Sequence, residues 1–216
     1  MNTTELQSAV TERYGELAQS SCCLSCGGAV DFAAPQPGEV GLDRGSGRGQ
    51  DVLRMAEAVG PEGFAFGIDA TAGMIDRARR NAEKLGITNV QFKQCDLADL
   101  DMPDDFVDVV ISNCTINHAS DKAAVWREIF RVLKPGGRFV VSDIYSLEEV
   151  PDAYKNDPTA VAECWAGSDT RPQYFAAVEA AGFTNLTALE ESAPYDKGQI
   201  KVASLTLAGT KPSRCC

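Results

Sequence analysis

The glycine-rich stretch Glu39–Asp51 constrains the fold of this chain more than any other part of its sequence. Apolar residues lead into Asp43, and glycines then occupy alternate positions from Gly45 to Gly49, just before a helical pattern. Glycine allows the positive φ angles of a tight turn and leaves room for a ligand close to the backbone. The start of the following helix offers N–H groups that lack helical partners. The stretch therefore predicts a strand, a turn and a helix that bind a ligand together, although such turns also serve as plain connectors.

Two classes of nucleotide cofactor use such a loop, and the glycine spacing separates them. A dinucleotide site reads Gly-x-Gly-x-x-Gly and lays a pyrophosphate on the helix N-terminus. Here the spacing is Gly-x-Gly-x-Gly, and Asp43 stands two positions before the first glycine. A carboxylate there would repel a pyrophosphate but would suit a ligand that carries an ammonium and a sulfonium group. The loop resembles the first motif of the class I S-adenosylmethionine (SAM) methyltransferases, and it favours SAM over NAD.

The length and charge of the chain limit the other classes of function. With 216 residues, the chain has the size of one large α/β domain. It has 20 lysines and arginines against 31 aspartates and glutamates, a net charge of −11, which opposes binding to nucleic acid and to anionic membranes. No apolar run approaches the roughly 20 residues of a membrane span, and Met1–Ser20 lacks the pattern of a signal peptide. We therefore expect a cytoplasmic protein that binds neither nucleic acid nor membrane.

Strand and helix patterns alternate along most of the chain. After the first strand, strands are predicted at 64–69, 89–93, 107–112 and 138–143, and a closing pair at 185–190 and 200–207. Helices are predicted at 3–19, 51–59, 75–85, 121–133 and 172–181. This order predicts a Rossmann-like class I methyltransferase fold, an open and mostly parallel seven-stranded sheet with one antiparallel strand and helices on both faces. We expect residues 1–36 to form an N-terminal helix and a cysteine-rich loop, 37–208 the methyltransferase domain, and 209–216 a tail with a cysteine pair.

The cofactor of such a sheet lies beyond the carboxyl ends of its strands. Asp69 ends the second strand, where its carboxylate could accept both ribose hydroxyls or cap the helix that follows Thr71. Asp96 and Leu97 follow the third strand and could bind the adenine edge, or they could belong to an ordinary acidic surface loop. Asn113 ends the fourth strand, beside the methionine half of the cofactor. The predicted cofactor residues are Asp43, Gly45, Ser46, Gly47, Gly49, Asp69, Ala70, Met74, Asp96, Leu97 and Asn113.

Four further segments carry a closer resemblance. They are Ile111–Asn117, Asp121-Lys122, Arg131–Arg138 and Ser142–Ile144. Together they resemble the arsenite methyltransferases, over roughly residues 37–207. The cysteine after Ser-Asn, Cys114, and Cys164 in Cys-Trp-Ala-Gly are the most specific features. The resemblance implies SAM-dependent methylation of arsenite, with methylarsenite as a second candidate. It also implies that thiolates of Cys114, Cys164 and the N-terminal pair Cys22-Cys23, with Cys26 close by, hold trivalent arsenic.

The chemistry of arsenic gives these cysteines a reason. Thiolates are soft ligands that select soft, thiophilic centres. Arsenic bound to three thiolates keeps a lone pair that can attack a sulfonium methyl group without a general base, so the protein contributes by positioning. The expected partners are a small-molecule substrate, arsenite or its thiol conjugates, and a thiol reductant.

The cysteines also have other interpretations. Cys114 and Cys164 could be small buried hydrophobic residues, Cys95 is interpreted as structural, and the group of Cys22, Cys23 and Cys26 could be half of a zinc site. Cys215 and Cys216 could help to collect arsenic or form a disordered tail. Two other functions stay open, a methyltransferase for a small organic acceptor and a thiol-based metalloid-binding protein with a decayed cofactor site.

Gly41 and Arg44 depart from the resemblance, which leads us to expect apolar residues at both positions of the first strand. A buried charge without a partner is very costly, so we expect Arg44 to reach solvent or to pair with a carboxylate. His118, the only histidine, is predicted to be a loop or cap residue rather than a proton carrier.

Overall fold

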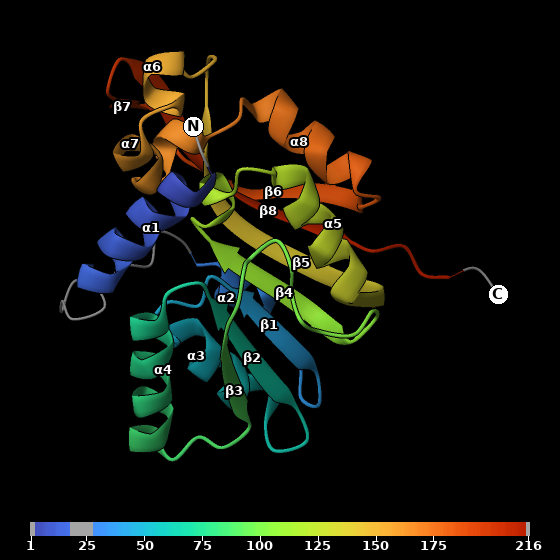
Figure 1. Cartoon of the computed structure of the whole chain (residues 1–216). Coiled ribbons are helices and arrows are strands. Elements are labelled where there is room, and N and C mark those ends of the chain that lie inside the picture. The colour runs from blue at the N-terminus through green and yellow to red at the C-terminus, as the bar shows by residue number, and fades with distance from the viewer. Residues whose placement is uncertain (1–2, 18–27, 215–216) are drawn as a thin grey trace.

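The computed structural model describes residues 3–17 and 28–214, which form an open sheet between helices (Figure 1). The strands are β1 (Val40–Arg44), β2 (Phe64–Asp69), β3 (Val90–Gln94), β4 (Val107–Asn113), β5 (Leu133–Ser146), β6 (Thr184–Glu191), β7 (Tyr195–Lys197) and β8 (Ile200–Thr210). The α-helices are α1 (Thr3–Leu17), α2 (Ala29–Ala33), α3 (Gln50–Val59), α4 (Ala72–Leu85), α5 (Lys122–Val132), α6 (Asp152–Lys155), α7 (Pro158–Ala162) and α8 (Arg171–Ala180). Two short 3-10 helices are η1 (Ile116–His118) and η2 (Trp165–Gly167).

The sheet has the strand order β3-β2-β1-β4-β5-β8-β6, and β7 pairs with β8 beside this path. The pairs among β1 to β5 are parallel, whereas β8 runs antiparallel to both β5 and β6. This confirms the predicted mostly parallel sheet with one reversed strand, and β7 is a short strand that was not predicted. The strand order reverses between β1 and β4, and ligands of open α/β sheets bind at this kind of switch point.

Helices cover both faces of the sheet and bury a separate apolar cluster on each. On one face, α2, α3 and α4 pack against residues such as Val109 and Ile111. On the other face, α5 and α8 pack against residues such as Val110. There the ring of Trp126 lies edge-on to the ring of Phe139, with 5.2 Å between the ring centroids. Burial on both faces explains why the middle of β4, residues 109–111, is entirely apolar. None of the helices in the described ranges is long and apolar enough to cross a membrane.

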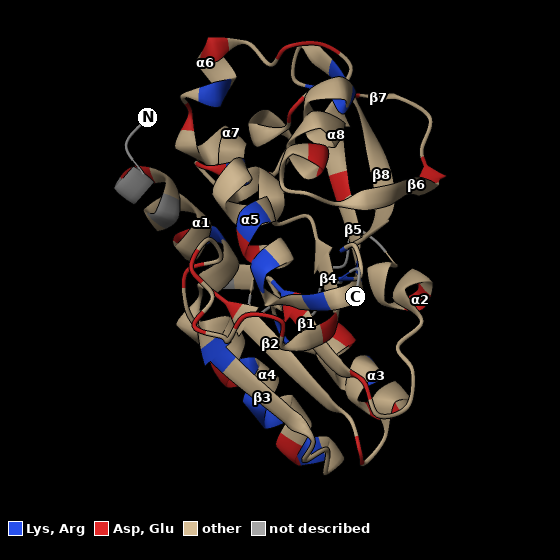
Figure 2. Ribbon diagram, turned by 90° about the vertical axis from the view of Figure 1, so that its right-hand side faces the viewer, with Lys and Arg blue, Asp and Glu red and all other residues tan. Residues whose placement is uncertain are grey.

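The fifth strand begins at Leu133, five residues before its predicted start. Gly136 donates its N–H to the carbonyl of Lys211, and Lys211 donates to the carbonyl of Gly137. The predicted turn through the two glycines is therefore an irregular beginning of β5 that pairs with the segment after β8. The excess of acidic residues is visible along the β3–β4 loop (residues 95–106), where red segments gather in Figure 2.

Gly41 has a packing reason. A Cβ built on Gly41 would lie 1.9 Å from Sδ of Met55 in α3, and Met55 is itself fully buried. The missing side chain lets α3 approach β1 closely, and this approach sets the distance between the glycine-rich turn and the sheet.

We predict that Gly41→Ala lowers the free energy of unfolding by about 1–3 kcal/mol, because overpacking in a dense core forces neighbouring side chains out of place. Chemical denaturation at equilibrium measures this change. Gly15→Ala is the matched control, since a Cβ at Gly15 in α1 meets nothing within 4 Å and alanine favours a helix. Equal stability of the Gly41→Ala variant and the native protein would contradict this account of the packing.

Candidate functional site

The glycine-rich turn after β1 is held against β2 and opens outward at one residue. Gly45 and Ser46 donate their N–H groups to the carbonyl of Ile68 at 2.7 and 2.9 Å. Gly45, Gly47 and Gly49 all have positive φ angles. A Cβ at Gly45 would lie 2.1 Å from the side chain of Thr115, whereas a Cβ at Gly47 would meet nothing within 4 Å. The turn therefore presents its backbone to a ligand at Gly47.

A half-buried carboxylate, Asp69, and a buried one, Asp43, lie beside this turn. Asp69 accepts the N–H of Gly47 on Oδ2 at 2.9 Å and the N–H of Thr71 on Oδ1 at 2.8 Å. Each oxygen keeps a second lone pair, so capping and the binding of ribose hydroxyls are compatible roles. Asp43 is 3% exposed, and its Oδ1 has no hydrogen-bond partner within residues 3–17 and 28–214. Burial, then repulsion from Asp51 and Asp69, raises the pKa of Asp43 well above its usual range. A cation at this place would stabilise the ionised carboxylate.

A cavity of about 440 Å³ lies between α1, the β3–β4 loop and η1. Its lining includes Leu6, Val10, Ala70, Asp96, Leu97 and Thr115. Three residues predicted to contact the cofactor, Ala70, Asp96 and Leu97, thus border one cavity.

The remaining predicted cofactor residues lie closer to the core. Asn113 donates to Oδ2 of Asp51 at 3.0 Å, which places it beside the acidic turn. Ser46 is buried, and its Oγ has no partner in the described part of the chain. Met74 is 1% exposed on α4, so its side chain lies inside the protein.

A second group of residues meets at the ends of β4 and β5. One ligand atom from each of Cys114, Asp143 and Cys164 lies within 4.8 Å of the others, and all three residues are buried. The Sγ of Cys164 lies 3.5 Å from Oδ1 of Asp143 and 3.4 Å from the carbonyl oxygen of Cys114. Cysteines that are 50 residues apart in sequence are thus brought together next to the turn that presents Gly47.

Both cysteines in this group have an unusual backbone. Cys114 has φ +53° and Cys164 has φ +75°. Residues other than glycine rarely adopt positive φ, and each instance costs on the order of 1–3 kcal/mol. Packing against Trp165 and Val161 holds Cys164 in place in a small apolar cluster that also contains Cys114. Strain at two converging thiols is typical of a functional site rather than of core filling.

Asn117 and Asp143 organise the space around the thiols. Asn117 donates through Nδ2 to Oδ1 of Asp143 at 2.8 Å and to the carbonyl of Ile144 at 2.7 Å. The same Nδ2 lies 3.7 Å from Sγ of Cys164. Asp143 keeps Oδ2 without a partner in the ranges that the structure covers. Both residues were given no role from sequence, although Asn117 and Asp143 belong to the segments that carried the resemblance.

Burial disfavours negative charge on this group. Burial raises the pKa of Asp143 to about 7, although bonds to Ile144 and Cys164 oppose the shift. The contact with Cys114 lowers the pKa of the Cys164 thiol, but burial and the Asp143 carboxylate outweigh it, and the pKa is raised. The Cys164 thiol therefore keeps its proton until a ligand replaces it, as is usual when binding displaces protons from cysteine.

The environment of Arg44 differs from the sequence prediction, which expected solvent or a carboxylate partner. Its side chain is 0% exposed and forms no ion pair with a carboxylate within 4.0 Å among the described residues. Instead, Nε donates to the carbonyl of Leu97 at 2.7 Å, and Nη1 lies 3.4 Å from Oγ1 of Thr115. Arg44 therefore neither reaches solvent nor bonds to a carboxylate, because a backbone carbonyl accepts its hydrogen bond.

His118 agrees with its prediction as a loop residue. It belongs to η1, borders the cavity and lies edge-on to the ring of Tyr14 from α1, with 5.5 Å between ring centroids. Burial, with Arg13 and Arg44 nearby, lowers its pKa to about 4. Its imidazole is therefore neutral near pH 7.

The other cysteines divide into two sets. Cys95 is half-buried at the cavity and, like Cys114 and Cys164, forms no disulfide. The remaining predicted cysteines lie outside the described residues. They are Cys22, Cys23, Cys26, Cys215 and Cys216.

Similarity to known proteins defines the class to which this protein belongs. The family model described as a methyltransferase domain matches residues 35–193, well over half of the chain. The chain therefore belongs to the methyltransferase-domain family, and its sheet is that of the class I SAM-dependent methyltransferases.

The relatives of the chain narrow this class. The chain is 38% identical over 201 residues to an arsenite methyltransferase of Halobacterium salinarum, covering 88% of this chain and 51% of that protein. It is 40% identical over 134 residues to an arsenite methyltransferase of Aquipseudomonas alcaligenes, and this match covers 59% of this chain and 39% of that protein. The crystal structure of an arsenic(III) SAM methyltransferase from Chlamydomonas reinhardtii matches with a TM-score of 0.75 and 28% identity, covering 96% of this chain and 74% of that one. These similarities confirm the predicted resemblance, although the matches span about half or less of the two sequence relatives.

We predict that Asp143→Asn changes how stability depends on pH. Between the ordinary pKa of 3.8 and the native value of about 7, the folded protein binds a proton at Asp143 that the unfolded chain has released. The native protein therefore loses stability through Asp143 as the pH rises through this window, on the order of 1 kcal/mol per pH unit, and the asparagine variant does not.

Denaturation series from pH 4 to 8 measure this difference. The free energy of unfolding of the variant minus that of the native protein should increase with pH and level off above about 7. A difference that stays constant with pH would show that Asp143 titrates normally.

Proposed function

We propose that this chain is a SAM-dependent methyltransferase of trivalent arsenic, with arsenite or methylarsenite as the acceptor. The observation that carries the proposal is the meeting of Cys114, Cys164 and Asp143 within 4.8 Å. Cys114 of this group follows Asn113 directly, at the end of β4, the strand that pairs with β1 before the glycine-rich turn. A pair of soft ligands beside a cofactor turn fits a thiophilic acceptor better than an organic one.

The residues around the turn fit the cofactor. Asp43 has an unpartnered carboxylate oxygen that suits an ammonium group, and Gly47 faces open space. Asp69 would bind the ribose hydroxyls, and Asp96 and Leu97 would bind the adenine at the cavity. When bound, SAM supplies a methyl group on a positively charged sulfur atom.

The cysteines would hold the acceptor. Each thiol that bonds to arsenic replaces a hydroxyl group, and the thiol proton leaves with that hydroxyl as water. Asp143, with its oxygen 3.5 Å from Sγ of Cys164, is placed to accept the thiol proton and pass it to the departing hydroxyl. The apolar neighbours Val161, Trp165 and Ala166 would exclude water from the bound arsenic.

The N-terminal segment would complete the site. We propose that residues 1–36 provide the substrate loop, that Cys22 and Cys23 supply a third thiolate with Cys26 as the alternative, and that residues 37–208 form the catalytic domain. Helix α1, which precedes these cysteines, packs on α7 and puts Leu6 and Val10 in the apolar cluster that contains both thiols. A thiol reductant and a reducing, cytoplasmic environment would keep these cysteines reduced.

Incubation of the purified protein with arsenite, a thiol and SAM tests the proposal directly. We expect methylated arsenic together with one S-adenosylhomocysteine (SAH) for each methyl group. Binding of SAM without any methylated arsenic would contradict the proposed acceptor and would favour a methyltransferase for an organic compound.

We predict that Cys114→Ser and Cys164→Ser each reduce arsenite methylation by at least about a hundredfold, because a hydroxyl is a poor ligand for a soft centre. SAM affinity should stay within about twofold of the native value, since neither thiol lines the cofactor turn. The matched control is Cys95→Ser, the same change at the cavity but outside the thiol group, and it should keep its activity. Full arsenite methylation by either of the first two variants would refute the proposed thiolate site.

We predict that Asp69→Asn lowers the affinities for SAM and for SAH to a similar degree, by about tenfold or more. The reason is that hydrogen bonds to a charged group are worth about 1.5–3 kcal/mol. Calorimetric titration measures both affinities. Asp76→Asn, an exposed carboxylate of α4, is the control and should bind both ligands normally. An unchanged affinity in the Asp69 variant would place the ribose elsewhere.

A further inference from the structure

Arg44 is a buried cation with an unusual acceptor. It is the last residue of β1, and its side chain passes under the cavity to the β3–β4 loop, where Nε donates to the carbonyl of Leu97 at 2.7 Å. Burial lowers its pKa to about 10, so the guanidinium stays charged near pH 7. A hydrogen bond from a charged donor is roughly twice as strong as a neutral one. The bond therefore ties Leu97 firmly to the central strand.

The surroundings of Arg44 offer little other compensation for its burial. The carboxylates of Asp143 and Asp96 favour its charge from a distance, and Cys95 and Tyr174 also face it. Its Nη2 has no partner in the described part of the chain. An apolar residue would fill this strand position without the cost of a buried charge. The hydrogen bond to Leu97 is thus what arginine provides at this position and an apolar residue would not.

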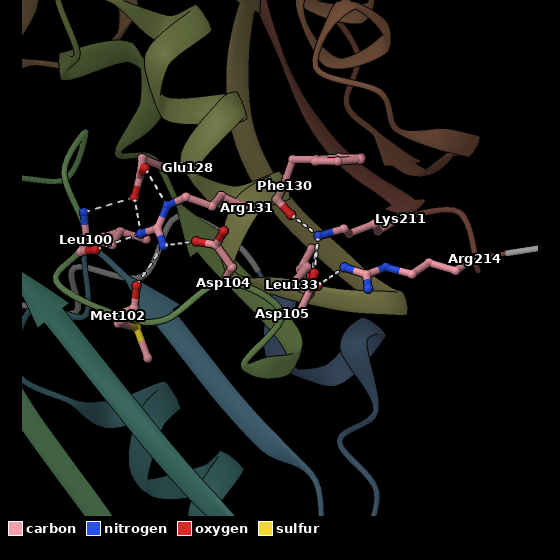
Figure 3. A network of polar contacts seen from close by, with 10 residues as sticks. All are labelled: Leu100, Met102, Asp104, Asp105, Glu128, Phe130, Arg131, Leu133, Lys211 and Arg214. Carbon is pink, nitrogen blue, oxygen red and sulfur yellow. Dashed lines mark hydrogen bonds and ion pairs between the residues drawn. The ribbon is translucent and has the colours of Figure 1, made fainter.

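A second arginine holds the other half of the same loop. Arg131 of α5 donates to the carbonyl of Met102 at 2.7 Å and to the carbonyl of Leu100 at 2.8 Å. Figure 3 shows these bonds together with the one from the N–H of Leu100 to Glu128, which is 3.1 Å long. Residues 95–98 border the cavity, whereas Leu100 and Met102 pack into the core on the α5 face. The two arginines therefore anchor different ends of the loop, and Arg44 is the one that anchors the end at the cavity.

We infer that Arg44 is a positioning residue for the adenosine half of the cofactor, which it serves by fixing Leu97 and the adjoining residues 95–98 at the cavity. The inference rests on the cofactor placement in the proposed function. A preformed loop binds more tightly because the ligand does not have to order it. The Arg44 side chain forms no hydrogen bond with either thiol, and its stronger hydrogen bond goes to Leu97 at the cavity, so a change of this side chain should act on cofactor binding rather than on the methyl-transfer step.

Arg44→Met tests this role, and Arg131→Met is the matched control on the same loop. The native protein and both variants are titrated with SAH, KM for SAM and kcat are measured with arsenite, and hydrogen–deuterium exchange is followed in residues 95–102. For Arg44→Met we expect Kd for SAH and KM for SAM to rise about tenfold, the effect of one lost charge-assisted hydrogen bond, with kcat within about twofold. Exchange should increase at 95–98, without a loss of thermal stability. For Arg131→Met we expect faster exchange at 100–102 and nearly native affinity.

Three results would overturn the inference: native SAH affinity in Arg44→Met, an equal loss of affinity in both variants, or no SAH binding by the native protein. If Arg44→Met does not fold, Arg44→Lys keeps the buried charge but loses the planar donor group, and the same loss of affinity is expected. A native protein that binds SAH but does not methylate arsenite would refute the proposed acceptor alone. The SAH titrations would still decide the role of Arg44.

Discussion

The candidate site depends on the parallel pairing of β4 with β5 at the switch point of the sheet. The ladder pairs Asn113 with Ser142, and the N–H of Cys114 continues it with a 2.8 Å bond to the Ser142 carbonyl. This bond places Cys114 beside the next residue of β5, Asp143. The same end of β4 also reaches the acidic turn through the bond between Asn113 and Asp51. One pair of strands therefore sets the distance between the cofactor turn and the thiols.

Electrostatics separates the two halves of the site. Around the glycine-rich turn, the buried Asp43 and the half-buried Asp69 have raised pKa values, and a bound cation would stabilise their ionised forms. Around the thiols, burial raises the pKa of Asp143 to about 7 and also raises the pKa of Cys164, so this half carries less negative charge before a ligand arrives than the same groups would carry in water. A positively charged donor and a neutral, thiophilic acceptor are the pair of ligands that such an arrangement favours.

Much of the fold could be predicted from sequence because it follows local patterns. The glycine spacing, the acidic strand ends and the alternation of helices with strands identified the mostly parallel sheet and the turn. The short strand β7 carries no distinctive pattern, and the early start of β5 depends on its bonds to Lys211. Neither feature is visible in the local sequence.

The site could be predicted only in part, because its contacts join distant segments. Cys114 and Cys164 were found through a family resemblance, whereas spacing alone gave no reason to join them. Asp143 and Asn117 were missed since their roles depend on a contact with Cys164. Arg44 was expected near solvent or a carboxylate, and its acceptor, the Leu97 carbonyl, lies in a loop 53 positions away. Backbone acceptors leave no trace in side-chain identity, so no sequence pattern could have indicated this one.

The most direct measurement is anomalous diffraction at the arsenic edge from crystals grown with arsenite and SAH. We predict one arsenic peak within bonding distance of Sγ of both Cys114 and Cys164, on the side of the cofactor's sulfur. A peak bound to only one of these sulfurs, or one located away from the cofactor, would contradict the account.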